Sequence, residues 1–186
     1  MDNTFVFILR TVLDIYASVL LVRFLLQMVQ ADFFNPISQT LFKLTSPVVE
    51  PLHKIFPTIG RFNSAALVAA ILVKWAFYLI VLSVSGMFGA QMFTYLAVAA
   101  FELLGTLIEI YFWGIFILVI SSWIGTAAHP TVRLVNQIVD PYMNLFRRFI
   151  PPLGMIDISP MVAIFGLMII RANIMPKLGS FIQPLL

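Results

Sequence analysis

The longest stretch of the chain with almost no charge constrains the fold more than any other feature of the sequence. From Ala65 to Gly125, 61 residues contain only three charged side chains, Lys74, Glu102 and Glu109. A core element of a soluble protein needs no such run, whereas one helix across a bilayer needs about 20 apolar residues. Over the whole chain only 10% of residues are charged, against about 25% in a soluble domain. The sequence therefore predicts an integral membrane protein.

Four apolar segments are long enough to be transmembrane helices, at residues 4–30, 65–85, 99–125 and 159–175. The fourth is near the lower length limit for a span. It is a short span, a span that continues past Pro176, or a partial insertion. Residues 86–98 are expected to form a hairpin connection, with room for an N-terminal extension of the third helix. The predicted fold class is an all-α membrane protein with four transmembrane helices.

The basic residues of the connections predict the orientation. Lys43, Lys54 and Arg61 lie in the first connection, and Arg133, Arg147 and Arg148 lie in the third. The middle connection has no basic residue, and the C-terminal tail has only Lys177. Because basic loops resist translocation, both long connections are expected in the cytoplasm and both termini outside. The expected location is a bacterial inner (cytoplasmic) membrane.

Comparison of the chain with itself reveals an internal repeat. Residues 46–60 align without a gap with residues 140–154, and the same offset of 94 places Pro36 on Pro130. With a slip of one residue, Asp-Ile-Tyr at 14–16 matches Glu-Ile-Tyr at 109–111. The chain is thus interpreted as two tandem copies, residues 1–92 and 93–186. Each copy has two spans, so the copies are parallel rather than inverted repeats.

Both long connections have polar residues at steps of three and four. In the first copy these are Gln39, Lys43, Ser46, Glu50 and His53, and in the second Arg133, Gln137, Asp140, Asn144 and Arg147. With apolar residues opposite, this spacing predicts amphipathic helices that lie in the membrane surface. Ser46-Pro47 and Asp140-Pro141 are signals for a helix start. Each connection is therefore expected to form two short helices or one kinked helix.

Proline and glycine then mark the return to the membrane. Residues 56–60 and 150–154 cannot continue a helix and are expected to turn the chain towards the next span. Ser159 is the expected N-cap of the fourth span. The residues of this motif in the second copy are Asp140, Pro141, Pro151, Pro152, Gly154, Asp157, Ser159 and Pro160.

The sequence D-P-Y-M-N-L-F-R-R-F-I-P-P-L-G-M-I-D-I-S-P at 140–160, within two tandem copies, resembles the YggT family, also called YlmG. The resemblance covers nearly the whole chain. It implies a four-span inner-membrane protein with no defined catalytic residues. It also implies links to osmotic tolerance and ion homeostasis in enterobacteria, to cell-division genes in Gram-positive bacteria, and to nucleoid distribution or haem attachment in cyanobacteria and plastids. The first copy departs from the pattern, with Ala66 in place of the proline and His53-Lys54 in place of Arg147-Arg148. The second copy is therefore expected to bear any shared function.

Ionisable residues inside the spans are the main candidates for function. They are Arg10, Asp14, Lys74 and Glu109. Such groups are costly in a bilayer and usually face a partner or a water-filled cavity. One hypothesis is a cation- or proton-handling site formed by Asp14 and Glu109. The other is structural pairing, of Arg10 with Asp14 on one helix face and of Glu109 with Lys74. Glu102 is expected near the outer interface, and Arg23 is expected to snorkel to the headgroups.

A second candidate set could contact lipids or partner proteins. It consists of the basic residues Lys43, Lys54, Arg133, Arg147 and Arg148 of the two connections. Arg147 and Arg148 adjoin Phe146 and Phe149, a combination that suits anionic headgroups or an acidic segment of a partner. The alternative is that these residues only anchor a surface helix.

No catalytic motif is present in the sequence. His53 and His129 are isolated, no metal-ligand spacing occurs, and the glycines are dispersed rather than gathered in a phosphate-binding loop. The expectation is a protein without enzymatic activity, cofactor or metal. Its expected partners are the lipid bilayer and other membrane proteins or further copies of itself, and no nucleic acid. Two functions remain open: a scaffold or assembly factor for envelope, division or osmotic homeostasis, and an ion or solute transport component.

Overall fold

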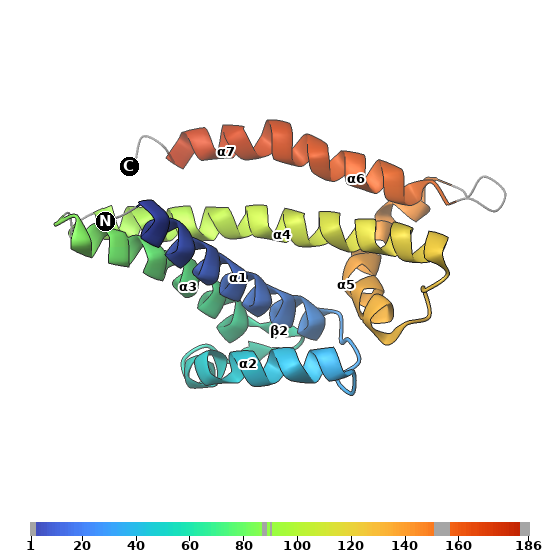
Figure 1. Ribbon diagram of the computed structural model, residues 1–186, viewed down its shortest axis with the longest axis horizontal. Coiled ribbons are helices and arrows are strands. Elements are labelled where there is room, and N and C mark those ends of the chain that lie inside the picture. The colour runs from blue at the N-terminus through green and yellow to red at the C-terminus, as the bar shows by residue number, and fades with distance from the viewer. Residues whose placement is uncertain (1–2, 87–88, 90, 151–156, 183–186) are drawn as a thin grey trace.

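The computed structural model describes residues 3–86, 89, 91–150 and 157–182, and this part of the chain is almost entirely helical. In chain order its elements are α1 (Asn3–Met28), α2 (Pro36–His53), β1 (Thr58–Ile59), β2 (Phe62–Asn63), α3 (Ser64–Val84), α4 (Gln91–Ile124), α5 (Pro130–Arg147), α6 (Ser159–Ile169), the π-helical turn η1 (Ile170–Ile174) and α7 (Met175–Ile182). Within these residues four helices are long and apolar enough to cross a membrane: α1, α3, α4 and the continuous helix Ser159–Ser180. The start of α1 and the end of α7 lie at the same end of the molecule, and α5 lies at the other (Figure 1).

The positions of the four spans agree with the prediction. The bounds of α1 and α3 differ from the predicted ones by at most two residues. Helix α4 begins at Gln91, so part of the predicted hairpin connection is indeed an N-terminal extension of the third span. The fourth helix continues past Pro176, which makes it long enough to cross a bilayer.

The π-helical turn explains how the fourth span passes this proline. Pro176 has no N–H to donate to the carbonyl of Ala172, and its ring would clash with that carbonyl in a regular α-helix. Just before it, the backbone N–H of Met175 donates to the carbonyl of Ile170, five residues back. The wider turn accommodates the proline without ending the helix.

The two long connections each form one continuous helix rather than two short ones. Helices α2 and α5 both have 18 residues and begin at Pro36 and Pro130. Their N-caps are Asn35 and His129, whose side chains accept hydrogen bonds from backbone N–H groups two residues later, at 2.9 and 3.3 Å. Pro47 and Pro141 lie inside the helices, so the expected restart does not occur. Packing against the spans compensates for the single backbone hydrogen bond that each proline removes.

The chain returns to the second span through a short hairpin that the sequence did not predict. Strands β1 and β2 are antiparallel, with Thr58 opposite Asn63 and Ile59 opposite Phe62. Gly60 in the connecting turn has φ +62°, a left-handed conformation that favours glycine. The equivalent turn of the second half includes Pro151, Pro152 and Gly154, which lie outside the described residues.

The start of α6 corrects one expectation. Ser159 is not the N-cap but the first helical residue, and its backbone N–H donates to Oδ1 of Asp157 at 2.9 Å. The N-cap position is Ile158, which has no side-chain acceptor, so the carboxylate before it takes over the capping role. In the first half Asn63 caps α3 by accepting from the backbone N–H of Ala66 at 3.0 Å.

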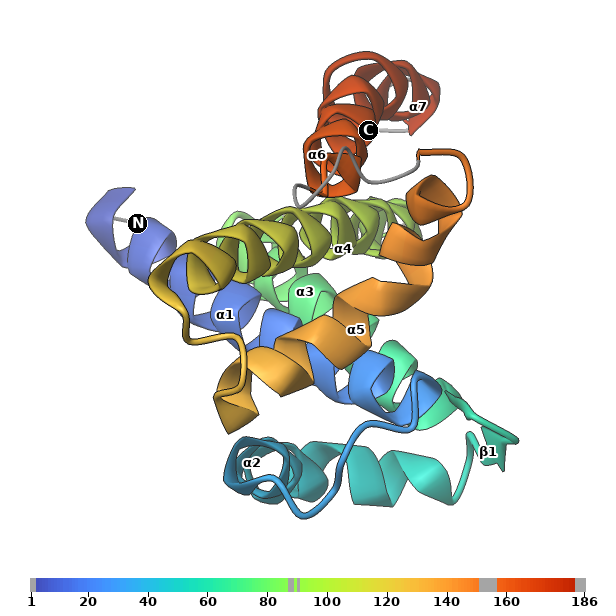
Figure 2. The ribbon, with the colours of Figure 1, turned by 90° about the vertical axis from the view of Figure 1, so that its right-hand side faces the viewer.

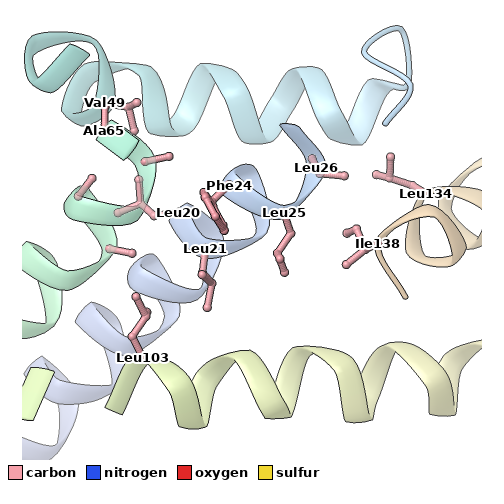
Figure 3. Close-up of a cluster of buried hydrophobic side chains, with 13 residues drawn as sticks. Leu20, Leu21, Phe24, Leu25, Leu26, Val49, Ala65, Leu103, Leu134 and Ile138 are labelled. Atoms are coloured by element: carbon pink, nitrogen blue, oxygen red, sulfur yellow. The ribbon is translucent and has the colours of Figure 1, made fainter. Parts of the chain in front are cut away.

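The main hydrophobic cluster surrounds α1 (Figure 3). The cluster contains buried residues from five helices. They are Leu20, Leu21, Phe24, Leu25 and Leu26 of α1, Val49 of α2, Ala65, Ala66, Ala69 and Ala70 of α3, Leu103 of α4, and Leu134 and Ile138 of α5. All four alanines are fully buried. Small side chains let two membrane helices approach closely, which explains the tight pairing of α1 with α3.

A smaller cluster holds the second half together. It joins Ile115 of α4, Val139 and Met143 of α5, and Ala163 and Leu167 of α6. Figure 2, which looks along the bundle, shows α5 crossing beside α4 and reaching towards α6. A side chain at Gly114 would lie 2.6 Å from Cγ2 of Val139, and one at Gly166 would lie 3.2 Å from the Tyr142 hydroxyl. These two glycines therefore let α5 contact both α4 and α6.

Candidate functional site: a charged hollow among the spans

Six charged side chains from the spans line one hollow of about 400 Å³. They are Arg10 and Asp14 from α1, Lys74 from α3, Glu102 and Glu109 from α4, and Arg171 from η1. Arg10 and Asp14 are one helical turn apart, and Glu102 and Glu109 are two turns apart, so each pair shares a helix face. All four candidates named from the sequence thus meet in one place. We call this site the charged hollow.

Asp14 is the counterion of a buried lysine. Nζ of Lys74 lies 2.7 Å from Oδ1 of Asp14, and only 6% of the lysine side chain is exposed. Nε of Arg10 lies 3.6 Å from Oδ2 of the same aspartate, as the i, i+4 spacing predicted. A buried cation without a partner is strongly destabilising, so this contact holds α3 against α1.

Glu102 connects three spans. Its Oε1 accepts a hydrogen bond from Nη2 of Arg10 on α1 at 2.9 Å. The same oxygen accepts one from the Tyr78 hydroxyl on α3 at 2.6 Å. These contacts with the basic and phenolic donors of the facing helices were not predicted from the sequence, and the expected position near the outer interface stays a prediction.

Glu109 pairs with Arg171 and not with Lys74. Nη2 of Arg171 lies 3.1 Å from Oε1 of Glu109. The predicted pair was wrong because α3 packs directly on α1, which turns Lys74 towards Asp14. The pair is more open than that of Lys74, since 50% of the Glu109 side chain and 63% of the Arg171 side chain are exposed.

The polar neighbours of the hollow bond to their own helices. The Ser18 hydroxyl donates to the carbonyl of Asp14 at 2.7 Å, and the Thr106 hydroxyl donates to the carbonyl of Glu102 at 3.2 Å. The three carboxylates all contact basic groups. In the described residues no group of three His, Cys, Asp or Glu side chains is placed to hold a metal ion. The arrangement can link spans electrostatically and can hold water or a small ion.

Arg23 does not snorkel to the headgroups. Its side chain is buried, and its Nη1 donates to the Thr45 hydroxyl at 2.8 Å and to the Ser46 hydroxyl and the Phe42 carbonyl at 3.3 Å each. The guanidinium also lies 4.6 Å from the centroid of the Phe42 ring. Helix α2 covers Arg23 and supplies its partners, so the residue joins α1 to α2.

The five basic residues of the connections fall into two groups. Lys43, Lys54 and Arg148 are exposed on or at the end of α2 and α5. Arg133 and Arg147 line one groove of about 750 Å³ between α4, α5 and the start of α6. We call it the α4–α5 groove.

Arg147 is already paired. Its Nη1 lies 2.8 Å from Oδ1 of Asp140, and its Nε lies 3.4 Å from Oδ2 of Asp157. Burial alone raises the pKa of Asp157, but hydrogen bonds from Ser159 and the neighbouring Arg147 outweigh it and hold that pKa below its usual value. These contacts join the end of α5 to the start of α6. Among the motif residues, Pro141 and Pro160 lie inside α5 and α6.

The candidate site named from the sequence left out two residues of the charged hollow, Glu102 and Arg171, and the neighbouring Tyr78, whose hydroxyl bonds to Glu102. Tyr78 is four residues after Lys74 and so shares its face, which was a usable signal. Glu102 shares a face with Glu109, but its partners depend on how α1 and α3 are rotated about their axes. Arg171 had no local signal, because its position follows from the π-helical turn.

Comparison with known proteins identifies the family. The family model described as CCB3/YggT matches residues 2–84 and 97–178. Uncharacterized protein YggT of Escherichia coli K12 is 31% identical over 98% of this chain and 96% of its own length. An uncharacterized protein of Pseudomonas aeruginosa is 32% identical over 97% of this chain and 92% of its own. YlmG homolog protein 2, chloroplastic, of Arabidopsis thaliana is 43% identical over 44 residues, which are 24% of this chain and 18% of that protein. No solved structure matches the chain. By the extent of these matches, the chain belongs to the CCB3/YggT family.

Proposed function

We propose that the protein is a non-enzymatic scaffold or assembly factor of the bacterial inner membrane. In this role α2 and α5 hold other membrane proteins, or further copies of the chain, at the membrane surface. The processes that it supports are those of the envelope, of division or of osmotic homeostasis. It needs no cofactor and binds no nucleic acid.

The observation that carries this proposal is the pairing of charges inside the spans. Asp14, Glu102 and Glu109 each contact a basic side chain from another helix, at 2.7, 2.9 and 3.1 Å. Charges that neutralise one another across helices stabilise a bundle, whereas a translocation path needs polar groups that exchange partners. The connections carry further exposed basic residues, Lys43, Lys54 and Arg148, where a partner or lipid can reach them.

The proposal includes a tandem repeat with two interfacial connections. Three features support it: α2 and α5 have equal length, their starts are 94 positions apart, and the family model matches the chain in two segments. The C-terminal ends of α1 and α4 also correspond. The backbone N–H of Ala31 donates a hydrogen bond to the carbonyl of Leu26, and that of Thr126 donates to the carbonyl of Ser121, both at 2.9 Å. In each half an acid of the first span pairs with a base of the second, Asp14 with Lys74 and Glu109 with Arg171.

The proposed orientation places both connections in the cytoplasm and both termini outside. The natural chain contains no cysteine, so single cysteines can be introduced at Lys43 and Arg148 in the connections and at Ser85 in the middle loop. A membrane-impermeant maleimide applied to intact spheroplasts should label only the cysteine at position 85. Labelling at 43 and 148 but not at 85 would reverse the orientation.

The scaffold role is tested by site-specific photo-crosslinking in native membranes. A photoreactive residue at Lys43 or Arg148 should give discrete protein adducts. The matched control is Ile80, an exposed residue of the α3 span, which should give lipid adducts only. Identical products from all three positions would contradict docking through the connections.

The alternative, an ion or solute transport component, is favoured by one observation. The charged hollow reaches all four spans and has room for several water molecules. Purified protein in liposomes should show no potassium or proton flux above that of empty liposomes if the scaffold proposal holds. Robust flux that is lost in Asp14→Asn and Glu109→Gln, with protein levels unchanged, would favour transport and overturn the scaffold.

A further inference from the structure

The α4–α5 groove has two chemically different walls. Leu118 and Val119 of α4 form an apolar wall inside the span, with the fully buried Ile115 behind them. Arg133 and Asn136 of α5 lie on the opposite wall. The apolar wall thus continues into a polar rim at the end of a transmembrane helix, where the hydrocarbon of a bilayer gives way to headgroups.

Arg133 is the basic group that is available to a ligand. Its Nε donates to the carbonyl of Ala128 at 3.0 Å, which holds the side chain in place. Its two terminal nitrogens have no hydrogen-bond or ion-pair partner among the described residues. Asn136 follows three residues later and therefore lies on the same helix face. Together they offer several N–H donors at one position of the rim.

Arg147 cannot take the same role. It is paired with Asp140 and Asp157, and it lies 14 residues after Arg133, or about 21 Å along the helix. One small anionic group therefore contacts Arg133 but not Arg147. The charged residues that line the groove are Arg133, Arg147 and Asp157. The charge of Asp157 balances that of Arg147, so the net positive charge of the groove comes from Arg133.

Trp123 marks the depth of the site. It lies in the last turn of α4, lines the groove and is 84% exposed. Exposed tryptophan at the end of a span is typical of the level of the lipid headgroups.

We propose that the α4–α5 groove binds one anionic phospholipid. The headgroup phosphate accepts hydrogen bonds from Arg133 and Asn136, and one acyl chain lies along Leu118 and Val119. Basic pockets at the end of membrane helices recognise anionic headgroups, and the apolar wall provides the place for the chain. This inference is independent of the scaffold role and of which protein partners bind.

The test uses the full chain, purified and delipidated in a non-ionic detergent. Phosphatidylglycerol and phosphatidylcholine with the same acyl chains are titrated separately, and bound lipid is counted by native mass spectrometry. One phosphatidylglycerol should bind at lower concentration than phosphatidylcholine. In Arg133→Gln the apparent affinity for phosphatidylglycerol should fall about tenfold, because a charge-assisted hydrogen bond is lost.

Two further variants separate the groove from general surface charge. Arg148→Gln removes the same charge from the end of α5 outside the groove and should change the affinity less than twofold. Ser122→Trp fills the groove from an exposed position of α4 without changing charge, and it should weaken binding as much as Arg133→Gln. Because it leaves Arg133 in place, it also tests the site if Arg133→Gln does not fold.

Three results would overturn the proposal. The first is equal binding of the two lipids, and the second is an equal loss in Arg148→Gln and Arg133→Gln. The third is competition by inorganic phosphate at the concentration of the lipid, which would mean that the acyl chain contributes nothing.

Discussion

The two halves of the molecule share a sequence pattern but pack differently. In the first half α1 and α3 touch directly, and α2 lies against the pair. In the second half α5 contacts both spans, and α4 meets α6 through a much smaller cluster of buried side chains. Of the most hydrophobic window of α3, 39% is buried, against 11% for the fourth span. The first half is the more compact part of the structure, and the α4–α5 groove lies in the second half.

Small residues account for this difference. At the offset of 94, Ala66 and Ala70 of α3 correspond to Pro160 and Ile164 of α6. The bulkier residues keep α6 from approaching α4 as α3 approaches α1. Glycines lie instead where α5 crosses, at Gly114 of α4 and Gly166 of α6. The position of the smallest side chains thus determines which helix is the neighbour.

The largest expected effect concerns the two ion pairs. Asp14→Asn leaves the buried Lys74 without its closest counterion, and should lower the free energy of unfolding by about 3 kcal/mol. Glu109→Gln breaks the open pair with Arg171 and should cost less than about 1 kcal/mol. Thermal or denaturant unfolding of both variants in the same detergent measures the difference. Equal losses would mean that the two halves bury their charges alike.

Exchanging corresponding residues between α3 and α6 tests whether side-chain size causes the difference in packing between the two halves. Ala70→Ile introduces the side chain of the second half into the fully buried α1–α3 contact, and overpacking should cost about 2–3 kcal/mol. The reciprocal Ile164→Ala affects a partly buried position and should cost about 1 kcal/mol. Unfolding of the two variants provides the comparison. A larger loss in Ile164→Ala would reverse the assignment of the compact half.

The close contact of α4 with α5 predicts a smaller effect. Gly114→Ala places a methyl group 2.6 Å from the Val139 side chain, and should cost about 1–2 kcal/mol as α5 shifts. Gly105→Ala in the same helix is the matched control, because its methyl group would lie at 3.7 Å from the flexible end of Met175. If the control loses as much stability in the same unfolding assay, the cause is the helix itself and not the contact.

The smallest effect is a pH dependence in the second half alone. The lowered pKa of Asp157 stabilises the protein at pH values above the ordinary carboxyl pKa, and this contribution is lost as the pH falls through the lowered pKa. Asp157→Asn should therefore cost a few tenths of a kcal/mol at pH 7, because the group is half-exposed, and this cost should shrink as the pH falls through the lowered pKa. Melting temperatures of both proteins from pH 7 to pH 3 measure this. The equivalent residue of the first half, Asn63, does not titrate, so Asn63→Ala should show a loss that is independent of pH.

Hydrophobicity and spacing were sufficient to predict the spans and the connecting helices. The bounds of α1 and α3 follow from long apolar runs, and the helical conformation of α2 and α5 follows from polar residues at helical spacing. The sequence left open whether each connection forms two short helices or one kinked helix, because tertiary packing decides whether a helix continues through Pro47 and Pro141. The hairpin at 58–63 was also missed, since two-residue strands leave no periodic signal.

The sequence predicted four of the six charged residues of the hollow and one of their pairs, Arg10 with Asp14. The sequence indicated Arg10, Asp14, Lys74 and Glu109, because charge inside a span is rare and usually has a partner. Which base meets which acid depends on the rotation of each helix about its axis. That rotation is determined by the alanines of α3 and by the π-helical turn before Pro176, so Lys74 faces Asp14 and Arg171 faces Glu109.

The balance of charge in the hollow has a consequence for a protein in an energised membrane. Arg10, Lys74 and Arg171 carry three formal positive charges, and Asp14, Glu102 and Glu109 carry three negative ones. A transmembrane voltage does work of about 2.3 kcal/mol on one elementary charge for each 100 mV that it crosses. A cluster with no net charge experiences almost no net force, so the membrane voltage does little net work on the charges of the hollow taken together.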